Sequence, residues 1–247
     1  MKSNEFYKSP VIITGGGNGS GLQIVKNFLE LGAHVYSLDI KFKKKNIQKS
    51  KKLEQVKIDL SKSKEIIKFS NYIFKKEKNI KCIVNNAGIT LDQNSNTLDV
   101  EKYWDETFDI NVKAPFLIVN HLKKKLNKNS TIVNITSISG RIAMKNNPAY
   151  NSSKAALSAL TRSLAFDLSE IGVRVNSVSP GYIKTNMTKK SYLSKKKRKS
   201  RTDRMMIKNF GDSKDIANAV VFLASSQSSY INGEELVVDG GLLKKGI

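Results

Sequence analysis

Residues 11–32 read VIITGGGNGSGLQIVKNFLELG, a short apolar run followed by a glycine-rich stretch and an amphipathic segment. Val11–Thr14 has the β-branched composition of a buried strand. Apolar residues then recur at helical spacing from Leu22 to Leu31, and Gly32 stands where a helix often ends in a left-handed residue. This order of strand, glycine turn and helix predicts the first half of a βαβ unit.

The same alternation continues along the chain. Further strands are predicted at 33–39, 55–59, 80–84, 131–136, 174–178 and 235–238, and helices over 62–76, from about 100, over 149–170 and over 214–224. Strands separated by helices form right-handed crossovers, which give a parallel sheet with helices on both faces. No repeat or Pro/Gly linker divides the 247 residues. The predicted fold class is therefore α/β, as a single Rossmann-like, doubly wound domain over residues 1–247 with about seven strands.

Composition bounds the compartment. No apolar run approaches the roughly 18 residues that a membrane span needs, and the first residues, MKSNEFYKSP, lack the apolar core of a secretory signal. The only cysteine, Cys82, excludes an intramolecular disulfide and a multi-cysteine metal site. We expect a cytoplasmic protein that has no membrane partner.

The charge is strongly positive, with 43 Lys and Arg against 21 Asp and Glu and a net charge of +22. The lysines are scattered in runs such as Lys43–Lys45, Lys123–Lys125 and Lys195–Lys199, and these runs lack the interleaved aromatic residues of a single-strand binder. Scatter of this kind indicates a lysine-rich composition, so no nucleic-acid partner is expected.

The glycine-rich turn follows the spacing T-G-x-x-x-G-x-G, through Thr14, Gly15, Gly19 and Gly21. Glycines let the backbone approach a pyrophosphate, whose charge is stabilised by free N–H groups at the helix N-terminus. The turn is not a phosphate-binding P-loop, because Leu22 stands where that motif needs lysine.

An acid ends the next predicted strand, Asp39, where a carboxylate can accept hydrogen bonds from both ribose hydroxyls and repel a 2′-phosphate. Asn18 also stands where a basic residue would favour NADP. Both residues favour NAD as the cofactor. Lys41 and Lys43–Lys45 could still attract a phosphate, so NADP stays open.

Tyr150 and Lys154 lie four residues apart, so on a helix their side chains share one face. A bare Y-x-x-x-K pattern also fits an exposed surface pair. Here Ser137 precedes it at the end of a predicted strand, and Asn111 lies in the helix before that strand.

With these residues, the chain resembles the short-chain dehydrogenase/reductase family over nearly its whole length. Thr14–Gly21 is similar to the family's dinucleotide loop, Asn85–Gly88 to its N-N-A-G strand end, and Val238–Gly241 to its V-D-G-G. The resemblance implies a catalytic set of Asn111, Ser137, Tyr150 and Lys154. Together with Asn18 and Asp39, the expected cofactor contacts are Thr14, Gly15, Gly19, Gly21, Asp59, Leu60, Asn86, Ala87, Gly88, Tyr150, Lys154, Pro180, Gly181, Ile183 and Thr185.

The implied roles agree with side-chain chemistry. A free tyrosine has a pKa near 10, and Lys154 with the positive nicotinamide of an oxidised cofactor is expected to favour the phenolate. Tyr150 would exchange a proton with the alcohol, while Ser137 hydrogen-bonds the substrate oxygen. By resemblance, Lys154 also holds the ribose hydroxyls and Asn111 positions a relay water. No metal is expected, since His34 and His121 stand alone.

The substrate is left open between two readings. One is an NAD-linked dehydrogenase of a sugar, a polyol or another small secondary alcohol, which Asp39 and Asn18 favour. The other is a 3-oxoacyl-acyl-carrier-protein reductase, which Asn86–Thr90 and the lysines near the cleft resemble; Ile171, where those enzymes tend to carry a basic residue, disfavours it. A catalytically silent dinucleotide- or nucleic-acid-binding protein is a remote third, since such a protein would be expected to lose the tyrosine or the lysine.

Two further features concern partners. A polar, basic segment near 185–210 follows a predicted strand and is expected to cover the site as a lid; its Lys195–Lys199 run either steers an anionic substrate or acidic carrier, or only reflects composition. The small residues Ala155, Ala156, Ala159 and Ser163 fit either a homodimer or homotetramer face or simple packing on the sheet.

Overall fold

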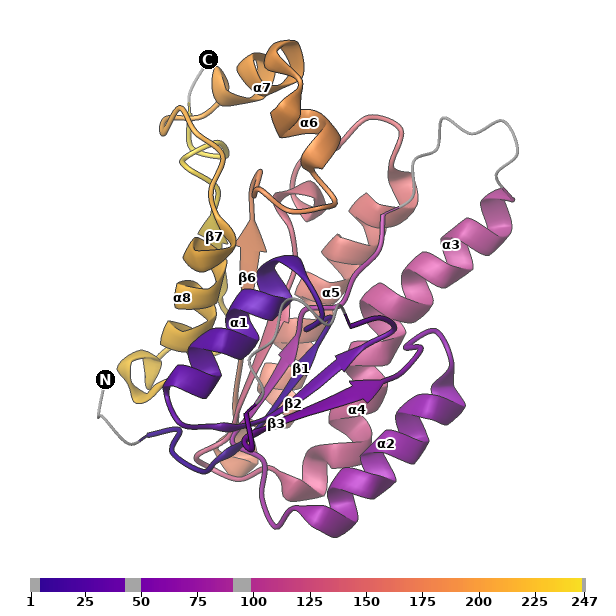
Figure 1. The fold of residues 1–247 in the computed structure, drawn as a ribbon, viewed down its shortest axis with the longest axis vertical. Helices are drawn as coiled ribbons and strands as arrows, with labels where there is room; N and C mark the ends of the chain where they lie inside the picture. The colour runs from indigo at the N-terminus through magenta and orange to yellow at the C-terminus, as the bar shows by residue number, and fades with distance from the viewer. Residues whose placement is uncertain (1–4, 43–49, 91–98, 246–247) are drawn as a thin grey trace.

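The computed structural model describes residues 5–42, 50–90 and 99–245. Its centre is a parallel sheet of seven strands in the order β3-β2-β1-β4-β5-β6-β7 (Figure 1). The strands are β1 (Pro10–Thr14), β2 (His34–Asp39), β3 (Leu53–Lys57), β4 (Cys82–Asn85), β5 (Thr131–Ile135), β6 (Arg174–Pro180) and β7 (Glu235–Val238). The α/β class and the doubly wound sheet of about seven strands are confirmed.

Helices cover both faces of this sheet, with α1 and α8 on one face and α2, α4 and α5 on the other (Figure 1). The α-helices are α1 (Gly19–Glu30), α2 (Ser63–Lys76), α3 (Val100–Phe108), α4 (Ala114–Leu122), α5 (Pro148–Asp167), α6 (Lys189–Leu193), α7 (Lys195–Thr202) and α8 (Ser213–Ala224). Short 3-10 turns occupy Lys123–Lys125, Ile138–Gly140, Ser169–Ile171 and Ser226–Ser228, and one π-helical turn spans Asp109–Lys113.

The alternation of strand side chains explains why both faces must be covered. In β1, Val11 and Ile13 pack with the α1 and α8 side, whereas Ile12 packs with the α2, α4 and α5 side. All three are completely buried. A strand that is apolar on both sides cannot face water, so the sheet is sandwiched between two helical layers.

Most predicted boundaries lie within two residues of the observed ones. The prediction at 55–59 is displaced, because the strand runs over Leu53–Lys57, and the predicted helix 149–170 ends at Asp167. The larger difference is in the segment beginning at Val100, where α3 and α4 are joined by the π-helical turn and do not form one regular helix.

The segment after β6 extends beyond the carboxyl edge of the sheet and carries α6 and α7 (Figure 1). Its anchor is Met205, which is 1% exposed and packs with Ile138 and Leu242. The Met206 and Ile207 N–H groups both donate to the Gly240 carbonyl, at 3.0 and 2.9 Å. The basic segment is therefore held at its C-terminal end by the last turns of the chain.

Within the described ranges, every helix is too short or too polar to span a bilayer.

Candidate active site

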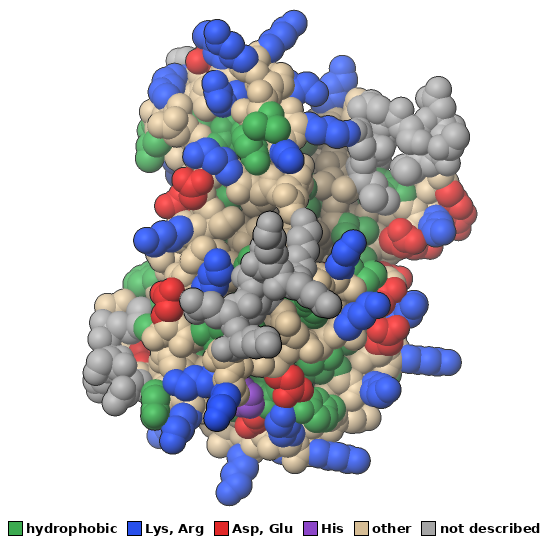
Figure 2. All heavy atoms as spheres, viewed as in Figure 1, with side chains coloured by type: hydrophobic (Ala, Val, Ile, Leu, Met, Phe, Trp, Pro, Cys, Tyr) green, Lys and Arg blue, Asp and Glu red, His purple; other side chains and the backbone are tan. Residues whose placement is uncertain are grey.

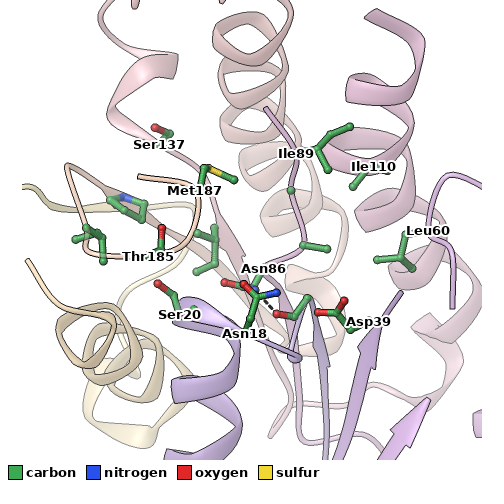
Figure 3. A pocket seen from close by; sticks show the side chains of 18 of the residues that line it. Asn18, Ser20, Asp39, Leu60, Asn86, Ile89, Ile110, Ser137, Thr185 and Met187 are labelled. Carbon is green, nitrogen blue, oxygen red and sulfur yellow. Dashed lines mark hydrogen bonds between the residues drawn. The ribbon is translucent and has the colours of Figure 1, made fainter. Parts of the chain in front are cut away.

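A cavity of about 440 Å³ opens at the carboxyl edge of the sheet, where the loops after six strands meet. Asp39 and Leu60 lie toward one end of it, Ser137 and Met187 toward the other, and Asn18 and Asn86 between them (Figure 3). Seventeen of the residues singled out in the sequence line it: Gly15, Asn18, Gly19, Gly21, Asp39, Asp59, Leu60, Asn86, Ala87, Gly88, Ser137, Tyr150, Lys154, Pro180, Gly181, Ile183 and Thr185. Thr14 and Asn111 are not among the lining residues.

Thr14 lies beneath the site and joins two strands. Its side chain is buried, and its hydroxyl oxygen accepts hydrogen bonds from the N–H groups of Asn86 (3.0 Å) and Ala87 (2.9 Å). The Asn86 amide donates back to the carbonyls of Thr14 (3.0 Å) and Gly15 (3.2 Å). The Thr14 hydroxyl thus joins β1 to the backbone after β4, and the expected cofactor contact at Thr14 stays a prediction.

The glycine turn brings the start of α1 to the cavity. Gly15 has a φ of +67°, and a Cβ on Gly21 would lie 2.0 Å from the Gly15 carbonyl oxygen. The N-cap residue Asn18 makes no side-chain cap, and the first turn of α1 holds no acid. The positive end of the α1 dipole is therefore not offset by a side-chain cap or by an acid in the first turn, and it lines the cavity at Gly19 and Ser20.

Asp39 is held in place at the end of β2. Its carboxylate accepts hydrogen bonds from the N–H of Gly17 (2.8 Å) and of Lys41 (3.1 Å). Lys43–Lys45, the basic run that kept NADP open, lies outside the described residues. Asp59 sits beside this end; burial raises the pKa of its carboxyl, but hydrogen bonds from Ser61 and from Lys62 outweigh burial and hold the pKa below its ordinary value.

Apolar residues that sequence reasoning missed complete this end of the cavity. Ile40, Ile58, Ile89 and Ile110 line it, and Ile89 and Ile110 are labelled in Figure 3. The signal for Ile40 and Ile58 was their adjacency to Asp39 and Asp59. Ile110 had no such signal, because it belongs to the π-helical turn.

Ser137, Tyr150 and Lys154 converge at the opposite end of the cavity. The Lys154 Nζ lies 5.7 Å from the centroid of the Tyr150 ring and donates a 2.8 Å hydrogen bond to the Ile135 carbonyl. Ser137 caps the turn Ile138–Gly140, and its hydroxyl oxygen accepts from the Ser139 N–H at 3.2 Å. A strand end and a helix thus present a hydroxyl, a phenol and an amine to one space.

Asn111 stands behind this group. It is fully buried in the π-helical turn; its amide accepts from the Ile89 N–H (2.9 Å) and donates to the Ile89 carbonyl (3.1 Å) and to the Ser153 hydroxyl (3.0 Å). A Cβ on Gly88 would meet Lys154 Nζ at 3.1 Å and Asn111 Oδ1 at 3.3 Å. Asn111 therefore holds the backbone after β4 against the lysine.

The last wall of the cavity follows β6. Gly181 packs so closely on β7's end that a Cβ there would lie 2.7 Å from the Asp239 Cα. The Asp239 carboxylate in turn accepts from the N–H groups of Gly241 and Leu243, both at 2.8 Å. Beyond it, Thr188, which sequence reasoning missed, accepts a 3.0 Å hydrogen bond from the Thr185 N–H and also lines the cavity. The Val238–Gly241 stretch thus supports the Pro180–Gly181 wall.

Comparison with known proteins identifies this arrangement. A family model described as enoyl-(acyl carrier protein) reductase matches residues 15–243. The chain belongs to the short-chain dehydrogenase/reductase family. It is therefore an oxidoreductase, of a family that uses NAD or NADP.

Individual relatives differ in their substrates. The 3-oxoacyl-(acyl-carrier-protein) reductase FabG of Rickettsia bellii is 36% identical over 234 residues, which cover 94% of this chain and 95% of that protein. The NAD-dependent glycerol dehydrogenase of Listeria innocua is 32% identical, with 93% and 92% covered. A solved 4-hydroxyisoleucine dehydrogenase complexed with NADH superposes with a TM-score of 0.88 at 29% identity, covering 96% of this chain and all of that one.

We call Ser137, Tyr150 and Lys154, which meet at one end of the cavity of this short-chain dehydrogenase/reductase, the convergent group. Burial changes the pKa values of two of them, Tyr150 and Lys154. It raises the pKa of the Tyr150 phenol above its ordinary value, and the hydrogen bond with Ser137 offsets this only in part. Burial also lowers the pKa of Lys154 to about 8. Burial therefore favours the neutral phenol in the protein alone, and the sequence-based expectation that Lys154 and an oxidised nicotinamide together favour the phenolate stays a prediction.

The buried lysine has a measurable consequence for stability. Its folded-state pKa of about 8 lies below the ordinary value of 10.5, so the unfolded chain binds the proton more tightly. The charge therefore destabilises the fold by about 3 kcal/mol below pH 8, and this cost fades as the pH rises toward 10.5. We expect the stability of Lys154→Met relative to wild type to fall by about 2–3 kcal/mol between pH 7 and pH 10 in urea unfolding.

The matched control is Lys64→Met, on the exposed face of α2. Its stability relative to wild type should stay level across the same pH range. If the difference in unfolding free energy between Lys154→Met and wild type is also independent of pH, the lowered pKa of the buried Lys154 is contradicted.

Proposed function

We propose that this enzyme interconverts a secondary alcohol and a ketone with NAD, and that its substrate is a sugar, a polyol or another small hydroxy compound. The observation that carries the proposal is the division of one cavity. Asp39 lies at one end, the uncapped start of α1 lies in the middle, and Ser137, Tyr150 and Lys154 lie at the other end. The cavity therefore offers a place for a dinucleotide beside a proton-transfer group.

The residues present fit a dinucleotide. The tight Gly15–Gly21 approach leaves room for a pyrophosphate against the helix N-terminus, and Asp39 offers two carboxylate oxygens to a ribose. A carboxylate at this point repels a 2′-phosphate, which supports NAD as the preferred cofactor. The likeness to the NAD-dependent glycerol dehydrogenase and to the NADH-complexed 4-hydroxyisoleucine dehydrogenase supports the same choice.

The proposed chemistry is a coupled loss of a proton and a hydride. Bound NAD supplies the acceptor for the hydride that leaves the carbinol carbon. Tyr150 accepts the hydroxyl proton as the C–O bond becomes a carbonyl, and returns a proton in the reverse direction. Ser137 donates a hydrogen bond to the oxygen where charge develops, and Lys154 places its positive charge beside the phenol. Asn111 holds the surrounding backbone, as its bonds to Ile89 indicate.

Replacing Tyr150 with Phe tests this assignment. Removal of the Tyr150 hydroxyl should lower kcat by at least about 100-fold, while NADH affinity in a fluorescence titration stays within a few-fold. Tyr72→Phe, on the exposed face of α2, is the matched control and should turn over normally. Near-normal turnover of the Tyr150 variant would sink the assignment.

Cofactor choice is tested at Asp39. Asp39→Asn keeps an acceptor for the Gly17 N–H but removes the charge, so the ratio of kcat/KM with NAD to kcat/KM with NADP should fall by about 10- to 100-fold. Asp212→Asn removes an acid outside the cavity and should leave the ratio as it is. An unchanged ratio in Asp39→Asn would contradict the role of this carboxylate.

A second candidate function is reduction of a 3-oxoacyl group on an acidic carrier. The observation that favours it is the charge of residues 185–210, which hold ten basic residues and one acid in a chain of net charge +22. Lys and Arg side chains crowd the end of the molecule that carries α6 and α7 (Figure 2). The likeness to FabG at 36% identity supports the same reading.

The two candidates are separated by one substrate panel. Purified enzyme is assayed with polyols, sugars and 3-oxoacyl thioesters, each with both cofactors. Oxidation of a polyol or sugar with NAD supports the first candidate, and reduction of acyl thioesters with NADPH as the clear favourite overturns it together with the NAD preference.

The basic segment makes its own prediction. Changing Lys195–Lys199 to glutamine should raise KM for an anionic substrate by about 3- to 10-fold at low salt, with kcat within about twofold, because the charge acts on encounter and not on chemistry. The effect should vanish near about 0.5 M salt, where charges are screened. Lys123–Lys125, at the opposite edge of the sheet, give the control. An equal KM at low salt would leave the charge without a role in substrate capture.

We also propose that the enzyme is a homodimer or homotetramer that uses the outer face of α5. Ala155, Ala159 and Ser163 are exposed there and do not pack on the sheet, and Phe166 on the same helix is 82% exposed. Small residues beside an exposed aromatic ring suit the close approach of another helix.

We also propose a cytoplasmic location. The single cysteine, Cys82, is buried and reduced, which supports a reducing compartment.

Ala159→Glu should convert the assembly to monomers, because it buries a charge without a partner. The measurement is molar mass by light scattering, with Lys64→Glu on α2 as the control. A wild-type enzyme that is monomeric at micromolar concentration, or a variant of unchanged mass, would contradict this face.

A further inference from the structure

Glu235 is a largely buried carboxylate that the proposed chemistry does not use. It begins β7, the strand at the edge of the sheet (Figure 1). Its side chain is 10% exposed and is not among the residues that line the cavity. Buried carboxylates are rare unless several donors satisfy them. The partners of this one lie far away in the sequence.

Three donors from three parts of the active site meet on it. The Thr136 hydroxyl donates to Glu235 at 2.6 Å, and the Ser158 hydroxyl donates to the same oxygen at 2.7 Å. The Arg141 guanidinium donates to the other oxygen. Burial raises the pKa of Glu235, but these hydrogen bonds outweigh it and hold the pKa below its ordinary value. The group is therefore ionised at neutral pH, and its hydrogen bonds are charge-assisted.

Each donor lies within four residues of Ser137 or Lys154 in the sequence. Thr136 stands between Ile135, whose carbonyl accepts from Lys154, and Ser137. Ser158 lies one helical turn after Lys154 and is also 3.1 Å from its carbonyl oxygen.

Arg141 completes the set, since it follows the turn Ile138–Gly140 that Ser137 caps. That turn is in close contact with α5, because a Cβ on Gly140 would lie 2.9 Å from the Ala155 nitrogen. Glu235 is thus hydrogen-bonded to three segments at once: the residue after β5, the residue after the turn Ile138–Gly140, and the helix α5.

We propose that Glu235 is a positioning residue, whose carboxylate fixes the end of β5 against α5 and so sets the distances among Ser137, Tyr150 and Lys154. The proposal rests on the function proposed for those three residues. A displacement of about 1 Å between reacting groups can cost about 100-fold in rate, so a tie that spans both elements has leverage on turnover without touching the substrate.

The test compares Glu235→Ala with Glu235→Gln. The alanine variant should lower kcat by about 10- to 100-fold, because the reacting groups are displaced. NADH affinity should stay within about twofold, because Glu235 is not hydrogen-bonded to Asp39 or to the glycine turn at the cofactor end of the cavity. The glutamine variant keeps an acceptor oxygen for Thr136 and Ser158 and should recover kcat to within about fivefold of wild type. Glu234→Ala, exposed and adjacent in the chain, is the matched control and should be as active as wild type.

A purely structural role predicts a different pattern, in which Glu235→Ala lowers Tm but keeps wild-type kcat well below that Tm. That result would overturn the inference. If the alanine variant does not fold, Ser158→Ala removes one donor alone, and an unchanged kcat in that variant would also overturn the inference.

The experiments distinguish failure of the proposed function from failure of the positioning role. Turnover retained in Tyr150→Phe rejects that function, whereas an inactive Tyr150→Phe beside a fully active Glu235→Ala rejects only the positioning role.

Discussion

The hydrogen bonds between Thr14 and the backbone after β4 are the constraint on which the site depends. The strand order reverses between β1 and β4, so the chain after one strand turns away from the chain after the other and leaves a crevice. A crevice of this kind can hold a ligand in one position only if the loops after β1 and β4, which form its two sides, keep a fixed separation. The Thr14 hydroxyl and the Asn86 amide take part in four hydrogen bonds across that junction. The same hydrogen bonds fix the glycine turn on one side of the crevice relative to Gly88 on the other side.

Burial, more than charge, governs the reactive end. It moves the pKa of Tyr150 upward and that of Lys154 downward, so both groups are pushed toward their neutral forms. A proton shuttle near neutral pH needs the opposite for the phenol. The protein contributes a dry space, a fixed lysine and the Ser137 hydrogen bond, and the remaining stabilisation of a phenolate must come with the positively charged cofactor. On this view, the enzyme is a proton acceptor mainly when the oxidised cofactor is present, which couples cofactor binding to the proton-transfer step.

The features that sequence predicts are those carried by short, local patterns. Val11–Thr14, the glycine turn and the Tyr150–Lys154 pair depend on residues within one or two turns of each other, and the structure places the glycine turn and the pair at the cavity. The strand Leu53–Lys57 was displaced in the prediction because it lies at the sheet edge and is only partly buried, which weakens the apolar pattern. The π-helical turn around Asn111 has no pattern in a single sequence, since it depends on packing against Gly88–Ile89 and Ser153. Glu235 is 77 and 99 residues from its hydroxyl partners, so only the folded chain brings them together.

The two lines of evidence about substrate come from opposite ends of the cavity and are physically independent. Asp39 lies at the end of β2, where the proposal places the cofactor ribose, whereas the basic residues 185–210 follow β6 and are proposed to act on a substrate that approaches the reactive end. The proposed preference for NAD therefore does not argue against an acyl or carrier-bound substrate. It would do so only if one group determined both the cofactor and the substrate. Uniform lysine enrichment is also a poor account of the segment, because its 26 residues hold +9 of the +22 charge. A charge so concentrated beside the mouth favours an anionic substrate in either reading, and a polyol substrate would then be expected to carry a carboxylate or a phosphate.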